Sequence, residues 1–204
     1  MTIRLEKIGK RFIRQWVFKD ITAEFRKGEI IAITGPNGSG KSTLMQVLWG
    51  QTLPSAGNIF WSEDSKEIDP SDLWRFISIA APYQDLIDEF TLSEQIDFHF
   101  QYKNPVNGIG KEELINALYL EDSRSKQIEH FSSGMRQRLR LGLALYSDAA
   151  VTFLDEPTTN MDQKGMDWYR QLLAEISNRL IFIATNNPSD YPEHSKTLQL
   201  SDFK

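Results

Sequence analysis

The chain has 204 residues, a length that suits one medium-sized domain able to bury its own apolar core. Hydrophobic residues make up 40% of the sequence and charged residues 25%, proportions that are ordinary for a soluble globular protein. The formal net charge of −5 argues against nucleic-acid binding, and the absence of cysteine excludes disulfides and thiolate chemistry.

The first 28 residues alternate between apolar and polar side chains and end in the turn-like Arg26-Lys27-Gly28, a pattern that predicts antiparallel strands. The segment lacks the apolar core of a signal peptide, and no stretch of the chain approaches the ~18 apolar residues of a transmembrane helix. If the protein works at a membrane, we therefore expect another chain to span that membrane.

A glycine-rich loop follows the next apolar run, residues 29–34, which reads as a buried parallel strand. The loop fits the phosphate-binding pattern G-x-x-x-x-G-K-[ST], and apolar residues at helical spacing follow it. Its glycines let backbone N–H groups face phosphates, Lys41 supplies a cation for the β and γ oxygens, and the Ser42 hydroxyl can ligate Mg²⁺. The alternative, a glycine-rich turn with a surface lysine, is disfavoured by the flanking strand and helix. The predicted nucleotide-binding residues of this loop are Gly35, Pro36, Asn37, Gly38, Ser39, Gly40, Lys41, Ser42 and Thr43.

Later segments continue the alternation of strands and helices. Short strands are expected at 58–61 and 77–81, and the pattern is helical from about 85 to 148. Strands return at 151–154 and 180–184, separated by a helix whose apolar stripe is Tyr169, Leu172, Leu173 and Ile176.

This order predicts an α/β fold, a P-loop NTPase core with a mainly parallel sheet, an N-terminal antiparallel β part and an inserted helical subdomain. We expect one domain over residues 1–204. Its core and antiparallel β part occupy about 1–84 and 149–204, and the helical subdomain about 85–148.

Two carboxylates, Asp155 and Glu156, end the predicted strand at 151–154 and precede Pro157. Beside a phosphate loop, one acid can hold Mg²⁺ while the other orients and deprotonates an attacking water. A solvated acidic turn is the alternative. The pair predicts a site for nucleotide hydrolysis.

Taken with these motifs, the chain resembles the nucleotide-binding subunit of an ATP-binding-cassette (ABC) transporter over essentially its whole length. Gln84, in Ala81-Pro82-Tyr83-Gln84, matches the glutamine that contacts Mg²⁺ and water. The run Phe131-Ser132-Ser133-Gly134-Met135 matches the signature usually written Leu-Ser-Gly-Gly-Gln, and Asn160-Met161-Asp162 matches a loop that crosses between two protomers. In the same resemblance, Asp155 holds Mg²⁺ and Glu156 is the catalytic base.

The resemblance implies an ATP-binding and ATP-hydrolysing subunit, with Mg²⁺ as cofactor, that couples dimerisation and hydrolysis to transport through a separate membrane permease. A second ABC ATPase chain, identical or different, is expected to form a head-to-tail sandwich on the cytoplasmic face of the membrane. No nucleic-acid partner is expected. The implied catalytic residues are Lys41, Gln84, Glu156 and Asn186, the implied Mg²⁺ ligands are Ser42, Gln84 and Asp155, and the nucleotide residues beyond the loop are Phe12, Ser132, Gly134 and Asp162.

Physical chemistry supports the role of the signature. Ser132 can cap a helix that starts near Gly134, so that its hydroxyl, the free N–H groups and the positive helix end face an anion. The family's adenine-stacking aromatic corresponds best to Phe12, with Trp16 as second choice; either ring could instead be core packing.

Two departures from the family pattern bear on turnover. The signature has Ser133 and Met135 where glycine and glutamine are usual. Asn186 follows Thr185 where the family has a histidine, and an amide can donate a hydrogen bond but cannot become a cation or shuttle a proton. Hydrolysis is therefore expected to be slow or to depend on a partner chain.

Three alternatives to an ordinary transport ATPase stay open. The chain could act as a low-turnover, nucleotide-gated switch paired with a different cassette. Its compact length resembles the haem-exporter ATPase of cytochrome c maturation. A soluble, non-transport ATPase of the same superfamily is disfavoured, because the chain has neither a coiled-coil insertion nor a second cassette and is acidic.

Overall fold

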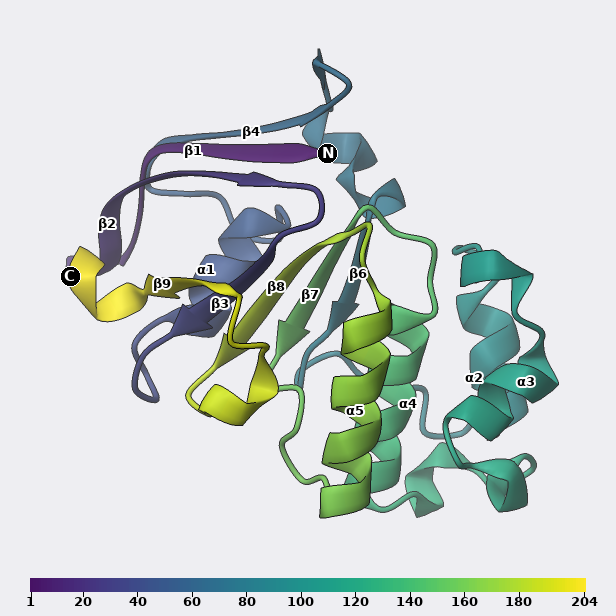
Figure 1. Cartoon of the computed structure of the whole chain (residues 1–204). Coiled ribbons are helices and arrows are strands. Elements are labelled where there is room, and N and C mark those ends of the chain that lie inside the picture. The colour runs from purple at the N-terminus through teal and green to yellow at the C-terminus, as the bar shows by residue number, and fades with distance from the viewer.

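Two sheets of different kinds organise the chain in the computed structural model, which describes all 204 residues (Figure 1). The first is wholly parallel and has the strand order β6-β7-β8-β3-β9. Its strands are β6 (Ile77–Ala80), β7 (Val151–Asp155), β8 (Leu180–Thr185), β3 (Ile30–Thr34) and β9 (Lys196–Gln199). The second is antiparallel and comprises β2 (Gln15–Arg26), β1 (Thr2–Phe12), β4 (Ala56–Glu63) and β5 (Lys66–Glu67), in that order. The predicted α/β fold with an N-terminal antiparallel part is confirmed.

Strands β7 and β8 are buried along their whole length, as expected for central strands of a parallel sheet covered on both faces. Phe153 and Phe182 lie on the face toward the antiparallel sheet and stack with ring centroids 5.1 Å apart. Leu154 and Ile183 point to the opposite face and join the second apolar cluster. Each fully buried side chain of this size contributes roughly 1.5–3 kcal/mol to folding. The parallel sheet therefore carries one core on each side.

Helix α1 (Lys41–Leu48) fills the space between the two sheets, where Leu44 and Met45 are inaccessible to solvent (Figure 1). Helices α4 (Ser133–Leu145) and α5 (Gln163–Glu175) cover the other face of the parallel sheet. The predicted stripe of α5 is confirmed for Tyr169, Leu172 and Leu173, which are buried, whereas Ile176 follows the end of the helix and is partly buried.

Helices α2 (Leu92–His99) and α3 (Lys111–Ala117) lie beyond α4, away from the sheet (Figure 1). Thr91 begins α2 with a capping box, since its hydroxyl accepts from the Glu94 N–H while the Glu94 carboxylate accepts from the Thr91 N–H. Although α4 falls within the predicted helical region, it packs on both the sheet and this outer pair. The boundaries of the helical subdomain near 85 and 148 stay a prediction.

The register of the parallel sheet determines which loops meet. Thr34 pairs with Thr185 between β3 and β8, and Asp155 pairs with Ala184 between β7 and β8. Because the three strands end at the same edge, the phosphate loop, the loop after Asp155 and the loop after Thr185 lie side by side.

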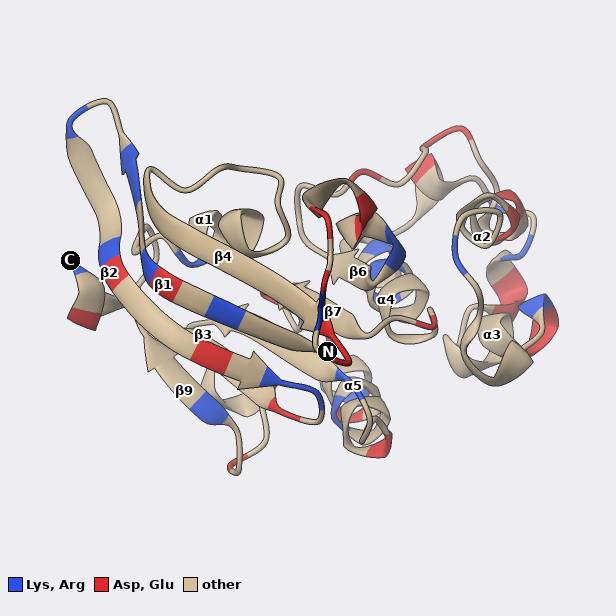
Figure 2. Ribbon diagram, turned by 90° about the horizontal axis from the view of Figure 1, so that it is seen from above, with Lys and Arg blue, Asp and Glu red and all other residues tan.

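The hairpin of β1 and β2 extends from the antiparallel sheet to the phosphate loop at this edge. A Cβ placed on Gly40 of the phosphate loop would come within 2.2 Å of Val17 Cγ1, so β2 is in close contact with the loop. Both strands carry basic and acidic residues, and basic residues predominate near the turn that joins them (Figure 2). None of the helices is long and apolar enough to cross a membrane.

Candidate active site

The phosphate loop joins the end of β3 to the start of α1. Gly40 precedes the helix with φ at 105°, a left-handed conformation that favours glycine, and no side chain caps the helix start. The first backbone N–H groups of α1 are therefore free to bind an anion, and the helix dipole adds partial positive charge at the same point.

A cavity of about 310 Å³ opens over this loop. It brings together residues from the hairpin, the loop, α1 and the segment after β7. Its lining residues are Val17, Asn37, Gly38, Gly40, Lys41, Ser42, Thr43 and Glu156. Most of the predicted loop residues and the predicted base thus share one cavity, which we call the phosphate cavity.

Three predicted loop residues lie beneath the phosphate cavity. The carbonyl oxygens of Gly35 and Pro36 accept hydrogen bonds from Lys41 Nζ at 2.9 and 3.3 Å, which holds the ammonium over the loop. The Ser39 hydroxyl is buried without a hydrogen-bond partner. These residues shape the loop and orient its cation.

Asp155 ends β7 near the Ser42 hydroxyl and is 2% exposed, and neither of its carboxylate oxygens forms a close hydrogen bond. Burial raises the pKa of this carboxyl and the neighbouring Glu156 adds to the rise, whereas the Ser42 hydroxyl, Tyr83 and Lys41 act in the opposite direction. A buried carboxylate without partners is costly unless a cation or donors satisfy it.

These residues fit Mg²⁺. Asp155 and the Ser42 hydroxyl provide hard oxygen ligands, and no group of three or more His, Cys, Asp or Glu side chains forms a complete metal cage. Magnesium in nucleotide sites is commonly held by one or two carboxylates together with substrate phosphates, which matches this sparse set.

Glu156 enters the phosphate cavity from a backbone held at φ 48°. Its N–H donates to Ala184 O at 2.8 Å, and the Thr159 hydroxyl donates to its Oε2 at 3.3 Å. Gln137 Nε2 of α4 donates to Glu156 O at 3.4 Å and to Pro157 O at 2.9 Å. The carboxylate is thereby directed toward the phosphate loop, where it can accept a proton.

Asn186 also reaches the phosphate loop. Its Nδ2 donates to Asn37 Oδ1 at 2.9 Å, and Asn37 lines the phosphate cavity. The amide that replaces the expected histidine is therefore beside the site, in the position for a neutral donor.

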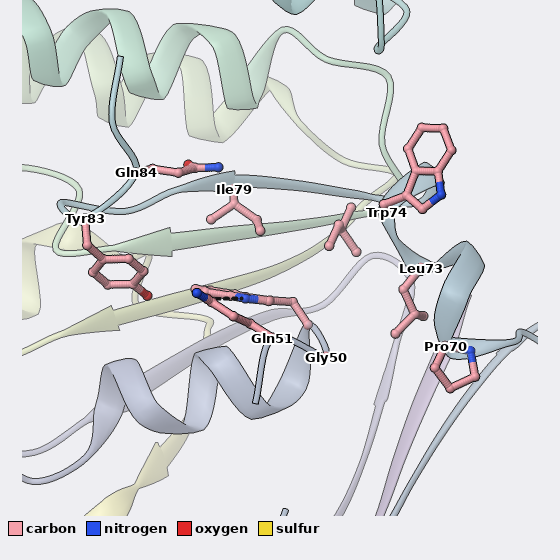
Figure 3. Close-up of a pocket in the computed structure, with 10 residues that line it drawn as sticks. Gly50, Gln51, Pro70, Leu73, Trp74, Ile79, Tyr83 and Gln84 are labelled. Atoms are coloured by element: carbon pink, nitrogen blue, oxygen red, sulfur yellow. Dashed lines mark hydrogen bonds between the residues drawn. The ribbon is translucent and has the colours of Figure 1, made fainter. Parts of the chain in front are cut away.

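Gln84 lies elsewhere. It lines a neighbouring cavity of about 410 Å³ together with Tyr83, Trp49 and Trp74 (Figure 3), and its carbonyl accepts from Arg140 Nε at 3.0 Å. The side chains of Tyr83 and Gln84 leave the backbone in different directions in Figure 3. The structure thus does not bring Gln84 into the phosphate cavity, because its side chain is directed into this second cavity. Its contact with Mg²⁺ stays a prediction.

The signature forms a third cavity, of about 380 Å³, at the start of α4. Ser132 caps the helix as predicted, with its Oγ accepting from the Met135 N–H at 3.2 Å. Asp162 lies in the same cavity, where its Oδ1 accepts from the Gly165 N–H at 2.8 Å and is 3.7 Å from an Arg138 guanidinium nitrogen. We call this the signature cavity. No residue lines both it and the phosphate cavity.

The two candidate aromatic residues differ in their surroundings. Phe12 is 54% exposed at the end of β1. Trp16 packs on Gly9, whose added Cβ would lie 2.9 Å from the indole, and the Arg11 guanidinium lies over its ring. Lys10 Nζ lies 5.2 Å from the centroid of the Phe12 ring, but Phe12 is the more exposed of the two, which favours the first choice. Stacking on adenine stays a prediction.

Sequence reasoning missed several residues of the site. Val17 lines the phosphate cavity only because β2 crosses the loop, which no local pattern indicates. Gln137 and Asp190 hold the segments that carry Glu156 and Asn186. For Asp190, a signal existed in Asn187-Pro188-Ser189-Asp190, where Asn187 accepts from the Ser189 N–H to start a helical turn.

The chain is similar in sequence to known ATP-binding proteins of transporters. The family model described as "ABC transporter" matches residues 18–159, more than half of the chain. A probable sulfate/thiosulfate import ATP-binding protein CysA from Chlorella vulgaris is 31% identical over 208 residues, covering 98% of this chain and 85% of that protein. The lipoprotein-releasing system ATP-binding protein LolD 1 from Chlorobium chlorochromatii is 27% identical and is covered to 88% of its length. Other relatives are longer, and the chain spans 56% of CysA from Pseudomonas aeruginosa, at 29% identity.

Solved structures share the fold. A putative ABC transporter ATP-binding protein from Pyrococcus furiosus superposes with a TM-score of 0.80 at 17% identity, covering 100% of this chain and 99% of the other. A dimeric ATP-binding cassette in a post-hydrolysis state with ADP and Pi gives a TM-score of 0.75 at 22% identity, covering 91% and 88%.

Proposed function

The chain belongs to the ABC transporter family as one of its ATP-hydrolysing subunits, and from this premise we propose how its own residues act. Mg-ATP binds in the phosphate cavity, a second cassette chain closes over it with its signature cavity, and closure drives a separate membrane subunit.

The observation that carries the proposal is the composition of the phosphate cavity. Lys41, Ser42 and Glu156 line it together, and the buried carboxylate of Asp155 is close enough to Ser42 and Lys41 for both to affect its pKa. A cation, a hydroxyl, a metal-holding acid and a free base are the groups that phosphoryl transfer to water requires.

The residues divide the chemistry among them. The free N–H groups of the loop and Lys41 hold the β and γ phosphates, and Glu156 accepts a proton from a water that attacks the γ-phosphate in line. Asp155 and Ser42 would hold Mg²⁺, which supplies charge neutralisation on the β and γ oxygens when bound. Asn186 donates a neutral hydrogen bond near the γ-phosphate.

A second cassette is proposed because one chain carries the two halves of a nucleotide site in different places. The signature cavity offers the N-terminus of α4, the Ser132 hydroxyl and Arg138, all suited to an anion. Arg138 Nε is buried without a partner. Head-to-tail pairing lets these groups meet the γ-phosphate bound by the other chain.

The groove beside Gln84 is proposed as the contact for the membrane subunit, which would keep the chain on the cytoplasmic face. Trp74 is 51% exposed at its rim (Figure 3). Arg140 binds Gln84 O and Arg136 binds Asp88 at 2.6 Å, so the signature helix α4 is tied to the segment that follows β6. A helix of the membrane subunit seated here could therefore sense movement of α4.

Phosphate release, measured with and without Mg²⁺ for wild type and Asp155→Asn, tests the proposed function. We expect wild type to release phosphate only with Mg²⁺, and Asp155→Asn to be slower by about tenfold or more, since metal charge stabilisation is worth several kcal/mol. A rate of phosphate release that does not depend on Mg²⁺, or a wild-type rate in Asp155→Asn, would contradict the assignment of this site to Mg-ATP hydrolysis.

A low-turnover switch is the second candidate, favoured by one observation. The Asn186 amide is engaged with Asn37 and carries no titratable group. If turnover stays near zero with the membrane subunit present while ATP still binds, the switch is the better description.

A further inference from the structure

The loops after β7 and β8 carry the two residues that face the attacking water in the proposed function, Glu156 and Asn186. Loops are ordinarily the mobile parts of a fold. Further contacts are therefore needed to hold the loop of Glu156 in a fixed position relative to the loop of Asn186. The hydrogen bond from the Glu156 N–H to Ala184 O is the last one between these two segments at the sheet, and it fixes neither the Glu156 side chain nor Asn186, which follow the last residues of the strands.

One buried carboxylate joins the two loops. Asp190 is 2% exposed and ends the single helical turn Pro188–Asp190. The Thr158 hydroxyl donates to its Oδ1 at 2.6 Å, and the Thr185 hydroxyl donates to its Oδ2 at 2.5 Å. Thr158 follows Glu156 by two positions and Thr185 directly precedes Asn186. The carboxylate therefore spans the gap between the two segments.

The carboxylate is itself anchored on all sides. Asn187 Nδ2 donates to Oδ1 at 3.0 Å, which completes the donors around the buried oxygens. The hydroxyl of Tyr169, on α5, donates to Asp190 O at 2.9 Å from a fully buried position. A buried acid with several short donors is rigid, and removing one partner leaves the others unsatisfied.

The backbone of Glu156 shows why such support is needed. Its φ of 48° is uncommon for a residue with a side chain, and such a conformation costs on the order of 1–3 kcal/mol unless the surroundings impose it. Gln137 holds the carbonyls of Glu156 and Pro157 from the α4 side. Asp190 holds Thr158 from the β8 side.

We propose that Asp190 is a positioning residue for ATP hydrolysis, which fixes Glu156 relative to Asn186 through the hydroxyls of Thr158 and Thr185. The proposal rests on the proposed function, because it takes Glu156 as the base. Asp190 is buried and does not line the phosphate cavity, so it acts on turnover through the two threonines.

Steady-state ATPase kinetics, ATP affinity and thermal unfolding of Asp190→Asn test the proposal. We expect kcat to fall about tenfold or more, since a misplacement of ~1 Å can cost about 10²-fold in rate, while ATP affinity stays at the wild-type value. Asp167→Asn is the matched control, because Asp167 is an exposed acid on α5 that contacts only Gln163 and Arg170. The Asp167→Asn variant should have the wild-type kcat.

Two variants of Thr158 keep the test decisive if Asp190→Asn unfolds. Thr158→Val removes the hydroxyl while preserving shape and should lower kcat as Asp190→Asn does, whereas Thr158→Ser should restore it. The double variant Asp190→Asn with Thr158→Val should be no slower than the slower single one, because both break the same link. Additive losses, or equal falls in kcat and ATP affinity, would overturn the proposal.

Glu156→Gln separates failure of this proposal from failure of the proposed function. In the Glu156→Gln background, Asp190→Asn should change the single-turnover rate little, since the base it positions is already gone. If Glu156→Gln does not slow hydrolysis, the proposed function fails whatever Asp190 does. If Glu156→Gln slows hydrolysis and Asp190→Asn does not, only the positioning role fails.

Discussion

The phosphate cavity and the signature cavity use the same physical device and differ in what surrounds it. Each lies at the N-terminus of a helix, α1 or α4, whose free N–H groups suit an anion. The phosphate cavity adds Lys41 and the Glu156 carboxylate, with the buried Asp155 next in the chain, whereas the signature cavity adds Ser132, Arg138 and an Asp162 carboxylate held by the Gly165 N–H and near Arg138. In the proposed function this difference assigns nucleotide binding and the base to the first cavity, and completion of another chain's site to the second.

The largest effect should come from Glu156, the carboxylate that shares a cavity with the phosphate loop. Glu156→Gln should slow phosphate release by ~10²-fold or more, because a positioned base typically contributes 10²–10⁴, and should keep ATP affinity. Paired measurements of hydrolysis and calorimetric binding check this contrast. Wild-type hydrolysis in the variant would remove Glu156 as the base.

The next effect concerns affinity. Lys41→Ala should weaken Mg-ATP binding about 30-fold or more, since losing one partner of a close charge pair costs roughly 2–5 kcal/mol. Titration calorimetry at low protein concentration measures affinity for the single chain. Equal affinities in variant and wild type would contradict the assignment of the phosphate loop as the nucleotide site.

Ser132→Ala tests the signature cavity. The single-chain affinity for ATP should not change, yet turnover at high protein concentration should fall about tenfold, because a hydrogen bond to a charged group is worth ~1.5–3 kcal/mol. Loss of the helix cap lowers stability by about 1 kcal/mol, so the melting temperature is measured alongside. Ser125→Ala, which changes an exposed serine that does not line the signature cavity, is the control. Weaker single-chain binding by Ser132→Ala would show that the two cavities are not separate.

The smallest effect is expected at Asn186. Asn186→Ala should reduce turnover about 2- to 10-fold, the range for one neutral hydrogen bond, while Asn186→His should retain or raise it. Steady-state assays of the chain alone and with its membrane subunit give both rates. Unchanged rates in both variants would discard the contact with the γ-phosphate, and activity only with the membrane subunit would favour the switch.

Much of the site was predictable because its residues follow strand ends in fixed patterns. The spacing of the phosphate loop and the acids after β7 predicts a hydrolytic nucleotide site without any tertiary information. The parallel register then brings these loops to one edge of the sheet. Local pattern and topology agree here, so Lys41, Ser42 and Glu156 are found together as expected.

Residues that act through long-range contacts were not predictable. Asp190 is buried only because Thr158 and Thr185, from two different loops, converge on it. Val17 reaches the loop through the crossing of β2, and Arg140 holds Gln84 through a contact between α4 and the segment after β6. Such contacts depend on how elements pack, and periodicity along one element does not encode them.

The size of the Glu156→Gln variant in solution tests most directly whether one chain's signature cavity completes the other's phosphate cavity. Sedimentation analysis with Mg-ATP, with ADP and without nucleotide gives the number of chains per particle. The head-to-tail sandwich predicts two chains with Mg-ATP and one chain otherwise, because a closed pair that cannot hydrolyse ATP cannot reopen. A single chain that binds ATP tightly without pairing would contradict it.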